Sequence, residues 1–579
     1  MSHQSLTEFD IIFAGGGSTA CVVAGRLAAC DSSLKILIVE AGEHTLDKPA
    51  HVQLYQFPFH TAPTSTTHTF HIGNPTPRLN GRALIVSCGR SVGGGSTVNF
   101  GAYTRAPASD YDDWAVEGWE SKNLIPLMKK LETYEVQPGR PTHGYTGPVK
   151  VSPGGHKLGI CEEFVRVGMT YHKRPYSDDT NDLETCNTYS VSSLILLPCL
   201  HPLTEAVSAM GKVSILSYLS YFIVVMNSCL KRYIDGTTGK RSDAAHCYIY
   251  NQAQNPNLQV WVGKRVTRVI FEDKRAVGIE FTNDHVSCPD ADQSLTIVKA
   301  SKLVVVSAGA FGSPAILERS GIGAEAVLKR CGIKPLVSLP GVGENYTDHN
   351  VALVPYLAAD EVVTMDPLWR REESATKDAL AQWTSNGKSL IASNGVDAKI
   401  KWRPDSDELK AMGSAFQPRW NEFFRDRPDK CVAIFSLIAG YIGPLFGTLP
   451  PRNYMMASYF TLYPASAGSV HIKMDENGKE ALDFTTGFFD DPSDIVPINF
   501  AYKKTREICR RMPSYRGELA DAHPKFPEGS AAACRETSGP VDLNAPDIIY
   551  TAEDDAAIEK YHRDCVQTTW HSVRAAKIA

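Results

Sequence analysis

The sequence lacks the features by which several classes of protein are identified. Its 59 Lys and Arg residues stand against 64 Asp and Glu residues, a net charge of −5, so we expect no nucleic-acid surface and no basic face for a membrane. The 14 cysteines form no CxxC pair and never gather with histidines at zinc-like spacing. We therefore expect no metal site, and reduced, buried thiols of the kind found in intracellular proteins.

Signals for secretion and membrane insertion are also scarce. Residues 1–13 carry acids just before their apolar run, where a signal peptide has a basic start, and so none is expected. The uncharged stretch Val213–Leu230 reaches the length of a transmembrane helix but contains four Ser and one Asn. We expect it not to span a membrane, and a membrane anchor stays an alternative. The last four residues, AKIA, are not a peroxisomal address.

What the sequence does contain is, first, a nucleotide-binding pattern at the start of a long chain. With 579 residues, of which 43% are hydrophobic and 21% charged, we expect two or more globular domains. The apolar run Phe9–Ala14 predicts a buried parallel strand, and residues 21–30 have apolar positions at helical spacing. Lys35–Val39 predicts a second strand, which ends on Glu40. The Glu40 carboxylate can accept hydrogen bonds from ribose hydroxyls.

The turn between the first strand and the helix, GGGSTA, has small residues where a dinucleotide needs them. Gly15 permits a tight turn, Gly17 lets the backbone approach a pyrophosphate, and Ala20 lets the helix pack on the strand. The start of the helix offers free N–H groups to the phosphates, and Ser18 and Thr19 are expected to bind the cofactor. An ordinary glycine-rich turn is the alternative, and the pattern alone does not separate FAD from NAD.

Two later stretches are far more specific. The first is GRSVGGGSTVNF, residues 89–100, and the second is SAGAFGSPAILERSGIG, residues 307–323. Together with the N-terminal turn they resemble the signature stretches of the glucose–methanol–choline (GMC) family of FAD-dependent oxidoreductases. A Gly-Gly-Gly-Ser turn lets backbone lie against a flat ring system, and Asn99 can place a donor and an acceptor beside that ring. By this resemblance, the first stretch contributes the FAD-binding residues Arg90, Gly93, Gly94, Ser96 and Asn99.

The resemblance extends over nearly the whole chain and implies an α/β fold. It has a Rossmann-type FAD-binding domain and an α+β substrate domain of antiparallel sheet and helices. Val260–Glu280 resembles the β-meander of the FAD domain, where Val266 would pack near the adenine, and plain sheet packing is the equal alternative. Leu303–Ser307 is expected to be a buried strand. The implied division is 1–155 and 241–350 for the FAD-binding domain, 156–240 for a substrate-domain insertion, and 351–579 for the substrate domain with an incomplete C-terminal catalytic region.

The catalytic region falls late in the chain. Residues 568–572, TTWHS, match the family's pattern around its catalytic histidine. The resemblance therefore makes His571 the general base that takes the proton of the alcohol. A near-terminal surface histidine is the alternative. The family's second catalytic residue, a His or Asn, and a segment that closes over FAD do not follow, so we expect the activity of this chain to be impaired.

One segment departs from the family. Residues 188–232 take the place of a much shorter connection, and the family pattern also stops after Ser572. Lys212-Val213-Ser214 is what a splice-donor-like string encodes, and Val573-Arg574 can be encoded in the same way. Translated introns are therefore one hypothesis for both departures. Sequencing the spliced transcript tests it, and a mature message that still encodes both segments would rule it out.

Further stretches are similar to the fungal short-chain alcohol oxidases of the family, among them 77–86, 237–246 and 334–349. The resemblance implies FAD as cofactor and the oxidation of a short primary alcohol, such as methanol, to the aldehyde, with O2 reduced to H2O2. It also implies a homo-oligomer and a peroxisomal location. Two alternatives stay open: an alcohol or choline dehydrogenase of the same family, and a non-catalytic flavin-binding product of a mis-spliced gene.

Overall fold

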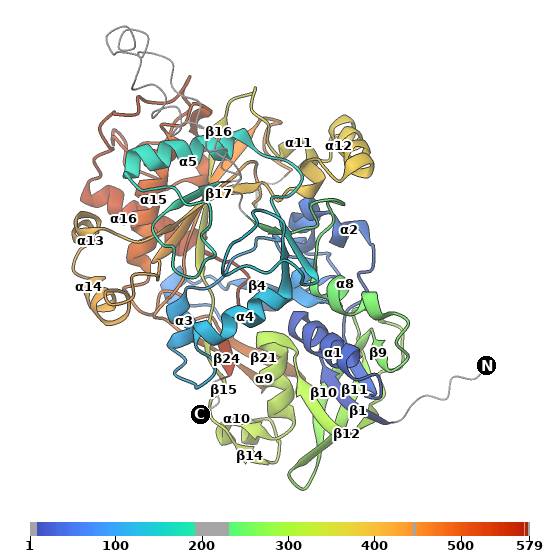
Figure 1. Cartoon of the computed structure of the whole chain (residues 1–579). Helices are drawn as coiled ribbons and strands as arrows, with labels where there is room; N and C mark the ends of the chain where they lie inside the picture. The colour runs from blue at the N-terminus through green and yellow to red at the C-terminus, as the bar shows by residue number, and fades with distance from the viewer. Residues whose placement is uncertain (1–7, 192–230, 444–446, 573, 577–579) are drawn as a thin grey trace.

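The computed structural model describes residues 8–191, 231–443, 447–572 and 574–576. They form two regions (Figure 1). A sheet around β1 (Glu8–Ala14) lies in the lower part of the figure, and a larger antiparallel sheet with β16 (Asn350–Ala358) and β17 (Val396–Trp402) lies in the upper part. The lower region combines the blue start of the chain with its green middle, so it is discontinuous in sequence.

The lower sheet has six strands, with β1 between two parallel neighbours. The apolar runs predicted as strands are β1 and β2, and both are almost wholly buried, as expected for parallel strands covered on both faces. Beyond β12 the pairing becomes antiparallel. The order across the sheet is β10 (Lys264–Glu272), β11 (Arg275–Asn283), β12 (Thr296–Val306), β1, β2 (Ile36–Val39) and β9 (Leu258–Trp261).

Helix α1 (Ser18–Cys30) covers one face of this sheet because its inward residues are small. Ala20 is fully buried against the sheet. A Cβ on Gly25 would lie 2.2 Å from the carbonyl oxygen of Tyr248, so only glycine lets α1 meet α8 (Ala244–Tyr248) at this distance.

The upper sheet has one face packed on helices and one face turned inward. Along β17, Ala398, Ile400 and Trp402 belong to the largest hydrophobic core, whereas Lys399 and Lys401 point to the opposite face. Helices α5 (Gly159–His172), α15 (Ile495–Cys509) and α16 (Ala552–Cys565) contribute side chains to that core. The order is β22 (Tyr515–Glu518), β16, β19 (Tyr454–Thr461), β18 (Ala433–Ile438), β17 and β7 (Tyr189–Val191), and β23 (Gln567–Thr568) pairs with β16.

Smaller elements connect the two regions. One four-stranded sheet has the order β21 (Glu480–Thr485), β20 (Gly468–Met474), β15 (Val342–Thr347), β24 (Arg574–Ala576). The other small sheets are β3 (His68–Ile72) with β4 (Ile85–Gly89), β5 (Glu132–Tyr134) with β6 (Val149–Ser152) and β8 (Arg232–Tyr233), and β13 (Ile322–Gly323) with β14 (Val337–Ser338). The remaining α-helices are α2 (Pro49–Val52), α3 (Ala108–Asp112), α4 (Ser121–Leu131), α9 (Gly309–Arg319), α10 (Glu325–Arg330), α11 (Asp366–Trp369), α12 (Glu373–Asn386), α13 (Ser406–Ala411) and α14 (Gln417–Arg419).

This architecture confirms the predicted fold class, with two local differences. The segment predicted as a meander, Val260–Glu280, forms β10 and most of β11 as an antiparallel pair, but its first two residues belong to β9, which joins the parallel part of the sheet. The strand at Leu303–Ser307 exists as the end of β12, but Leu303 is 50% exposed. None of residues 303–307 is fully buried, although Val305 packs against the core cluster that contains Ala20 and Ala24 of α1.

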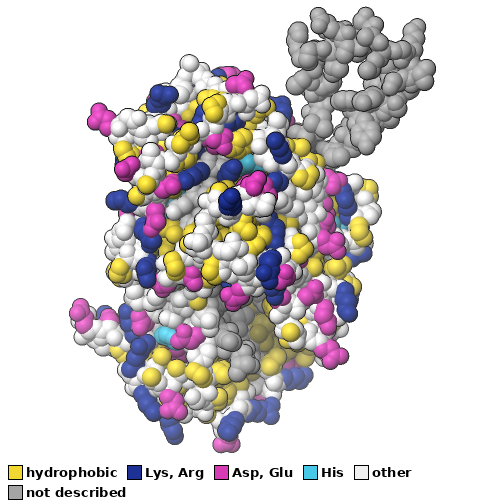
Figure 2. All heavy atoms as spheres, turned by 90° about the vertical axis from the view of Figure 1, so that its left-hand side faces the viewer, with side chains coloured by type: hydrophobic (Ala, Val, Ile, Leu, Met, Phe, Trp, Pro, Cys, Tyr) yellow, Lys and Arg dark blue, Asp and Glu magenta, His cyan; other side chains and the backbone are white. Residues whose placement is uncertain are grey.

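Two further expectations can be compared with the described residues. The cysteines in these ranges are all free, but only some are buried, and Cys30 is exposed. No helix in the described ranges is both long and apolar enough to cross a bilayer, and the stretch Val213–Leu230 lies outside them. On the face shown in Figure 2, basic and acidic side chains are interspersed.

Candidate active site

Three glycine-rich turns meet where β1 ends. Gly15 has a φ of 104°, and a Cβ on it would lie 2.7 Å from the Cα of Ala308, in the second signature stretch. Gly94 has a φ of 53°, and its Cβ would lie 2.9 Å from the Cα of Gly17. Only glycine permits such backbone-to-backbone contacts. The three motifs, far apart in sequence, therefore form one surface.

The N-terminus of α1 is available for a phosphate. Gly17 precedes the helix without a side-chain cap, and a Cβ on it would meet no atom closer than 3.8 Å. Within the described ranges, the backbone N–H groups of Ser18 and Thr19 have no acceptor. The Ser18 hydroxyl donates to the carbonyl of Gly93 at 2.9 Å, and Ala20 is buried beneath. Free N–H groups at the positive end of a helix fit the pyrophosphate of a dinucleotide.

Glu40 holds the turns together from the end of β2. Its two carboxylate oxygens accept the backbone N–H groups of Gly16, at 2.7 Å, and Gly42, at 2.9 Å. The side chain is 8% exposed, and burial raises its pKa despite these bonds. Each oxygen keeps a lone pair for a further donor, so a ribose hydroxyl can still be bound.

Two predicted cofactor residues have protein partners. The buried Arg90 guanidinium is paired with Asp284 and donates to the carbonyl of Thr66 and the hydroxyl of Ser287, both at 2.6 Å. It therefore ties loops together at the base of the site. Val266 lies in the hydrophobic core of the lower sheet, which fits the plain-sheet alternative. Contact of either residue with FAD stays a prediction.

The loop that ends on Asn99 faces the interior of the site. The Ser96 hydroxyl donates to the carbonyl of Gly93 at 2.7 Å, which closes the turn. The Asn99 side chain is exposed, and its Oδ1 accepts from the backbone N–H of Gly101 and from Nη1 of Arg241, both at 2.8 Å. Because the oxygen is occupied, the Nδ2 donor is the group left for a ligand.

His571 lies opposite a second histidine. Its Nδ1 is 3.2 Å from Nδ1 of His349, and the rings meet at 85° with centroids 5.2 Å apart. The His349 ring in turn stacks on Phe460 of β19, at 5.8 Å. The His571 side chain is exposed and His349 is half-buried, but neighbouring protein atoms restrict the hydration of both rings, which lowers the pKa of His571 and lowers that of His349 to about 3. Both imidazoles are therefore neutral near pH 7.

Asp348 holds the turn that carries His571. Its carboxylate accepts from the hydroxyls of Thr568 and Thr569, the latter at 3.1 Å. It also accepts from the backbone N–H groups of His571, at 3.1 Å, and His349, at 2.7 Å. The side chain is 1% exposed, and burial raises its pKa. One buried carboxylate thus fixes both histidines.

The catalytic turn contacts the Asn99 loop through aromatic rings. Trp570 has a left-handed φ of 59°, a conformation that costs on the order of 1–3 kcal/mol for a side chain of this size. Its ring stacks on Phe100, with centroids 6.0 Å apart and 26° between the planes. The strain is thus accompanied by a contact that brings the two parts of the site together.

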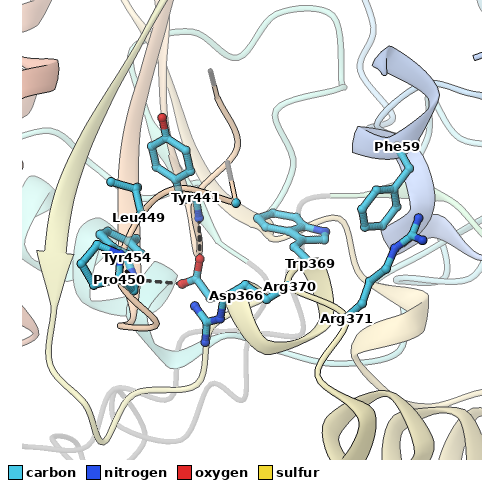
Figure 3. A pocket seen from close by; sticks show the side chains of 10 residues that line it. Phe59, Asp366, Trp369, Arg370, Arg371, Tyr441, Leu449, Pro450 and Tyr454 are labelled. Carbon is cyan, nitrogen blue, oxygen red and sulfur yellow. Dashed lines mark hydrogen bonds between the residues drawn. The ribbon is translucent and has the colours of Figure 1, made fainter. Parts of the chain in front are cut away.

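A separate hollow of about 470 Å³ is lined by Phe59, Trp369 and Tyr454, among others (Figure 3). Phe57 packs on Phe100 at 4.0 Å and on Trp369 at 6.0 Å, and Trp369 lines the hollow. From the same helix, α11, the Asp366 carboxylate accepts the backbone N–H groups of Tyr441 and Tyr454, as the dashed lines in Figure 3 show. A series of ring contacts therefore runs from the lining of this hollow to Trp570, the neighbour of His571.

Sequence reasoning missed three residues of the site: Asp348, His349 and Arg241. All three stand in stretches that resemble the fungal alcohol oxidases, 334–349 and 237–246. A signal was therefore present in the sequence. No spacing rule assigns them a role, however, because Asp348 and His349 reach His571 across more than 220 positions.

The fold and the glycine turns together define a Rossmann-type nucleotide-binding protein with a pair of histidines near the nucleotide site. The chain belongs to the GMC oxidoreductase family, whose model matches residues 9–191 and 226–351. It is therefore an FAD-dependent oxidoreductase, and the open helix N-terminus and the glycine turns fit FAD.

Curated relatives and solved structures agree with this assignment. Alcohol oxidase 1 of Komagataella phaffii is 37% identical over 99% of this chain and 86% of its own length. The alcohol oxidase of Candida boidinii is 37% identical over the same shares of the two chains. A formate oxidase from Aspergillus oryzae has a similar fold, with a TM-score of 0.75, 17% identity and coverage of 99% of this chain and 89% of its own.

Proposed function

We propose that the chain oxidises a short primary alcohol, such as methanol, to the aldehyde, and that O2 is reduced to H2O2. One observation carries the proposal: two neutral histidines, His571 and His349, lie in direct contact beside the Asn99 loop. The alcohol oxidases among the relatives support the choice of substrate. In the balanced reaction, RCH2OH and O2 give RCHO and H2O2.

The contact between His571 and His349 restricts the tautomers of both rings, and so determines which nitrogen can accept the proton of the alcohol. One Nδ1 must donate to the other, because two lone pairs cannot face each other at 3.2 Å. If His571 donates, its Nε2 is unprotonated and can accept the alcohol proton. His349 then carries a proton on Nε2 and can donate to the alcohol oxygen. The resulting His571 cation is stabilised by the charge of Asp348.

FAD, when bound, supplies the acceptor for the hydride and passes the electrons to O2. The residues of the chain orient the alcohol and move its proton. Phe460 stacks on His349, and Trp570, the neighbour of His571, stacks on Phe100, so aromatic rings flank the histidine pair. Aromatic walls favour a short, uncharged alcohol over a charged substrate, because a charge would lose its hydration there.

The test is to add methanol without oxygen to the FAD-loaded chain and to follow the flavin spectrum. We expect the absorption to bleach with methanol but not with tert-butanol, which has no hydrogen on its carbinol carbon. Readmitted air should then restore the absorption and produce aldehyde and peroxide in equal amounts. No bleaching, in a protein whose flavin dithionite does reduce, would contradict the proposal.

The same measurement separates the alternatives. Bleaching by methanol without peroxide in air would identify a dehydrogenase of the family. Flavin that binds but does not bleach would identify a non-catalytic flavoprotein. The expected impairment of turnover, the homo-oligomer and the peroxisomal location stay predictions.

A further inference from the structure

Arg241 is a buried cation directly behind the Gly93–Asn99 loop. Its side chain is 3% exposed. Nη1 donates to Oδ1 of Asn99 at 2.8 Å and to the carbonyl of Ser96 at 3.4 Å. Nε donates to the carbonyl of His51 at 2.9 Å. Arg241 therefore joins the loop to the 51–52 segment.

The charge of Arg241 is not neutralised by an ion pair. No carboxylate lies within salt-bridge distance of it in the described ranges, and its Nη2 has no partner there. The neighbouring acid, Asp243, uses its oxygens on the start of α8, where it accepts from Ala245, His246 and the His246 ring. Burial lowers the pKa of Arg241 only to about 10, so the guanidinium stays charged at neutral pH.

The Asp243 carboxylate raises the pKa of Arg241 without pairing with it, and the histidines near Arg241 carry no charge. Burial lowers the pKa of His51 to about 4 and that of His60 to about 3, so both rings are neutral. A buried cation without an ion-pair partner acts strongly on charge that appears nearby, because little water screens it. The nearest place for such charge is the face of the loop that carries Asn99.

The amide of Asn99 is oriented by the same contact. Oδ1 already accepts from Arg241 and from the N–H of Gly101, and an amide flip would set Nδ2 against two donors. The Nδ2 group therefore stays on the accessible side of the loop. Phe100, the next residue, contacts Trp570 beside His571, so the Asn99 loop lies next to the turn that carries His571.

We propose that Arg241 is a positioning residue for the flavin: it locks the Asn99 amide with its donor toward the ring and holds an unpaired positive charge behind the loop. The charge and the locked donor favour reduction, because the reduced flavin is richer in electrons. This inference rests on FAD binding and not on the proposed alcohol oxidation. It can therefore fail or hold independently of that activity.

The experiment measures the reduction potential of the bound flavin by dye equilibration with a chemical reductant, so no alcohol is needed. Arg241→Met should lower the equilibrium constant for flavin reduction at least tenfold, which lowers the reduction potential by about 30 mV for a two-electron couple. Arg241→Lys keeps the charge but loses the planar fork, and its shift should be smaller. The matched control is Lys240→Met, whose exposed ammonium pairs with Asp47 at 2.8 Å and whose loss should leave the potential unchanged.

A double-mutant cycle with Asn99→Ser identifies the route. If Arg241 acts in part through the amide, the shift caused by Arg241→Lys should largely disappear in the Asn99→Ser background. A wild-type potential in flavin-loaded Arg241→Met would overturn the proposal. If Arg241→Met does not bind flavin, the test rests on Arg241→Lys. An unchanged reduction potential in Arg241→Lys, or additive shifts in potential for Arg241→Lys and Asn99→Ser, would also overturn the proposal.

Discussion

Replacing Asp348 with Asn removes the negative charge beside His571 but keeps the size and shape of the side chain. The carboxylate accepts from the hydroxyl of Thr569 and from the backbone N–H groups of His349 and His571. Asn supplies one oxygen and one amino group, so some of these donors lose their acceptor. The change therefore tests both the charge and the hydrogen bonds.

The size of the effect follows from the neighbouring imidazole. An opposite charge within about 4–6 Å shifts a pKa by about 1–3 units, and each unit is worth about 1.4 kcal/mol. Without the carboxylate, the cation formed on His571 loses about 1.4–4 kcal/mol, which slows proton transfer about tenfold to thousandfold. We expect reduction of the flavin by methanol to be about 100-fold slower, within that range.

The Asp348→Asn change should lower the pKa of His571, which leads to a specific prediction for the pH dependence of the rate. Desolvation already lowers the pKa of His571, and removing Asp348 lowers it further. The base is then neutral over a wider pH range but weaker, so raising the pH will not restore the rate.

The assay is anaerobic stopped-flow reduction of the flavin, in variants checked for flavin content and thermal stability. Thr569→Val is the control: it removes one hydroxyl donor and leaves the charge, and should cost about 1 kcal/mol, roughly fivefold. If Asp348→Asn retains its flavin and is reduced at the wild-type rate, Asp348 has no part in proton transfer.

Three further changes probe the other contacts. His571→Asn should slow flavin reduction about 10²–10⁴-fold with flavin content unchanged. In the wild type, kcat/KM should rise with pH through a pKa below the ordinary value for histidine, because desolvation lowers the pKa of His571. A kcat/KM that does not change with pH would contradict the role of His571 as base. Glu40→Gln should weaken FAD binding about tenfold, because one charged hydrogen bond is lost. If a fluorescence titration gives the variant the same affinity for FAD as the wild type, Glu40 does not contribute to FAD binding. Gly94→Ala should prevent flavin binding, because its Cβ would lie 2.9 Å from a backbone Cα at a φ of 53°, whereas Gly159→Ala, with no atom within 4 Å, should bind flavin normally.

The sequence predicted the elements whose cause is local. β1, α1 and β2 begin and end within a residue or two of the apolar runs, except that α1 starts earlier, at Ser18. Apolar runs, small residues and a glycine turn act over short distances, and all three are visible in the sequence. The exposure of Leu303 was not predictable in this way, since it depends on which distant parts of the chain pack against β12.

The site was predictable only where a motif carried it. The glycines of the two turns were placed by their steric requirement, and His571 by family resemblance. The partners of Arg90 were not predictable, because Asp284 lies 194 positions away. Asp348 likewise reaches the catalytic turn only through the pairing of β23 with β16. Such long-range contacts depend on the closed sheets and not on any local pattern.

The position of β1 in its sheet also has a consequence for synthesis. β1 pairs with β12 along its length, and the hydroxyl of Ser301 reaches Asp10 across 291 positions. At about 5–20 residues per second, a ribosome needs about 15–60 s to add that length. During this interval the first strand has an unpaired edge of the kind that invites aggregation. FAD cannot bind before β12 emerges from the ribosome. A newly made chain therefore depends on protection of β1 until more than half of the chain has been translated.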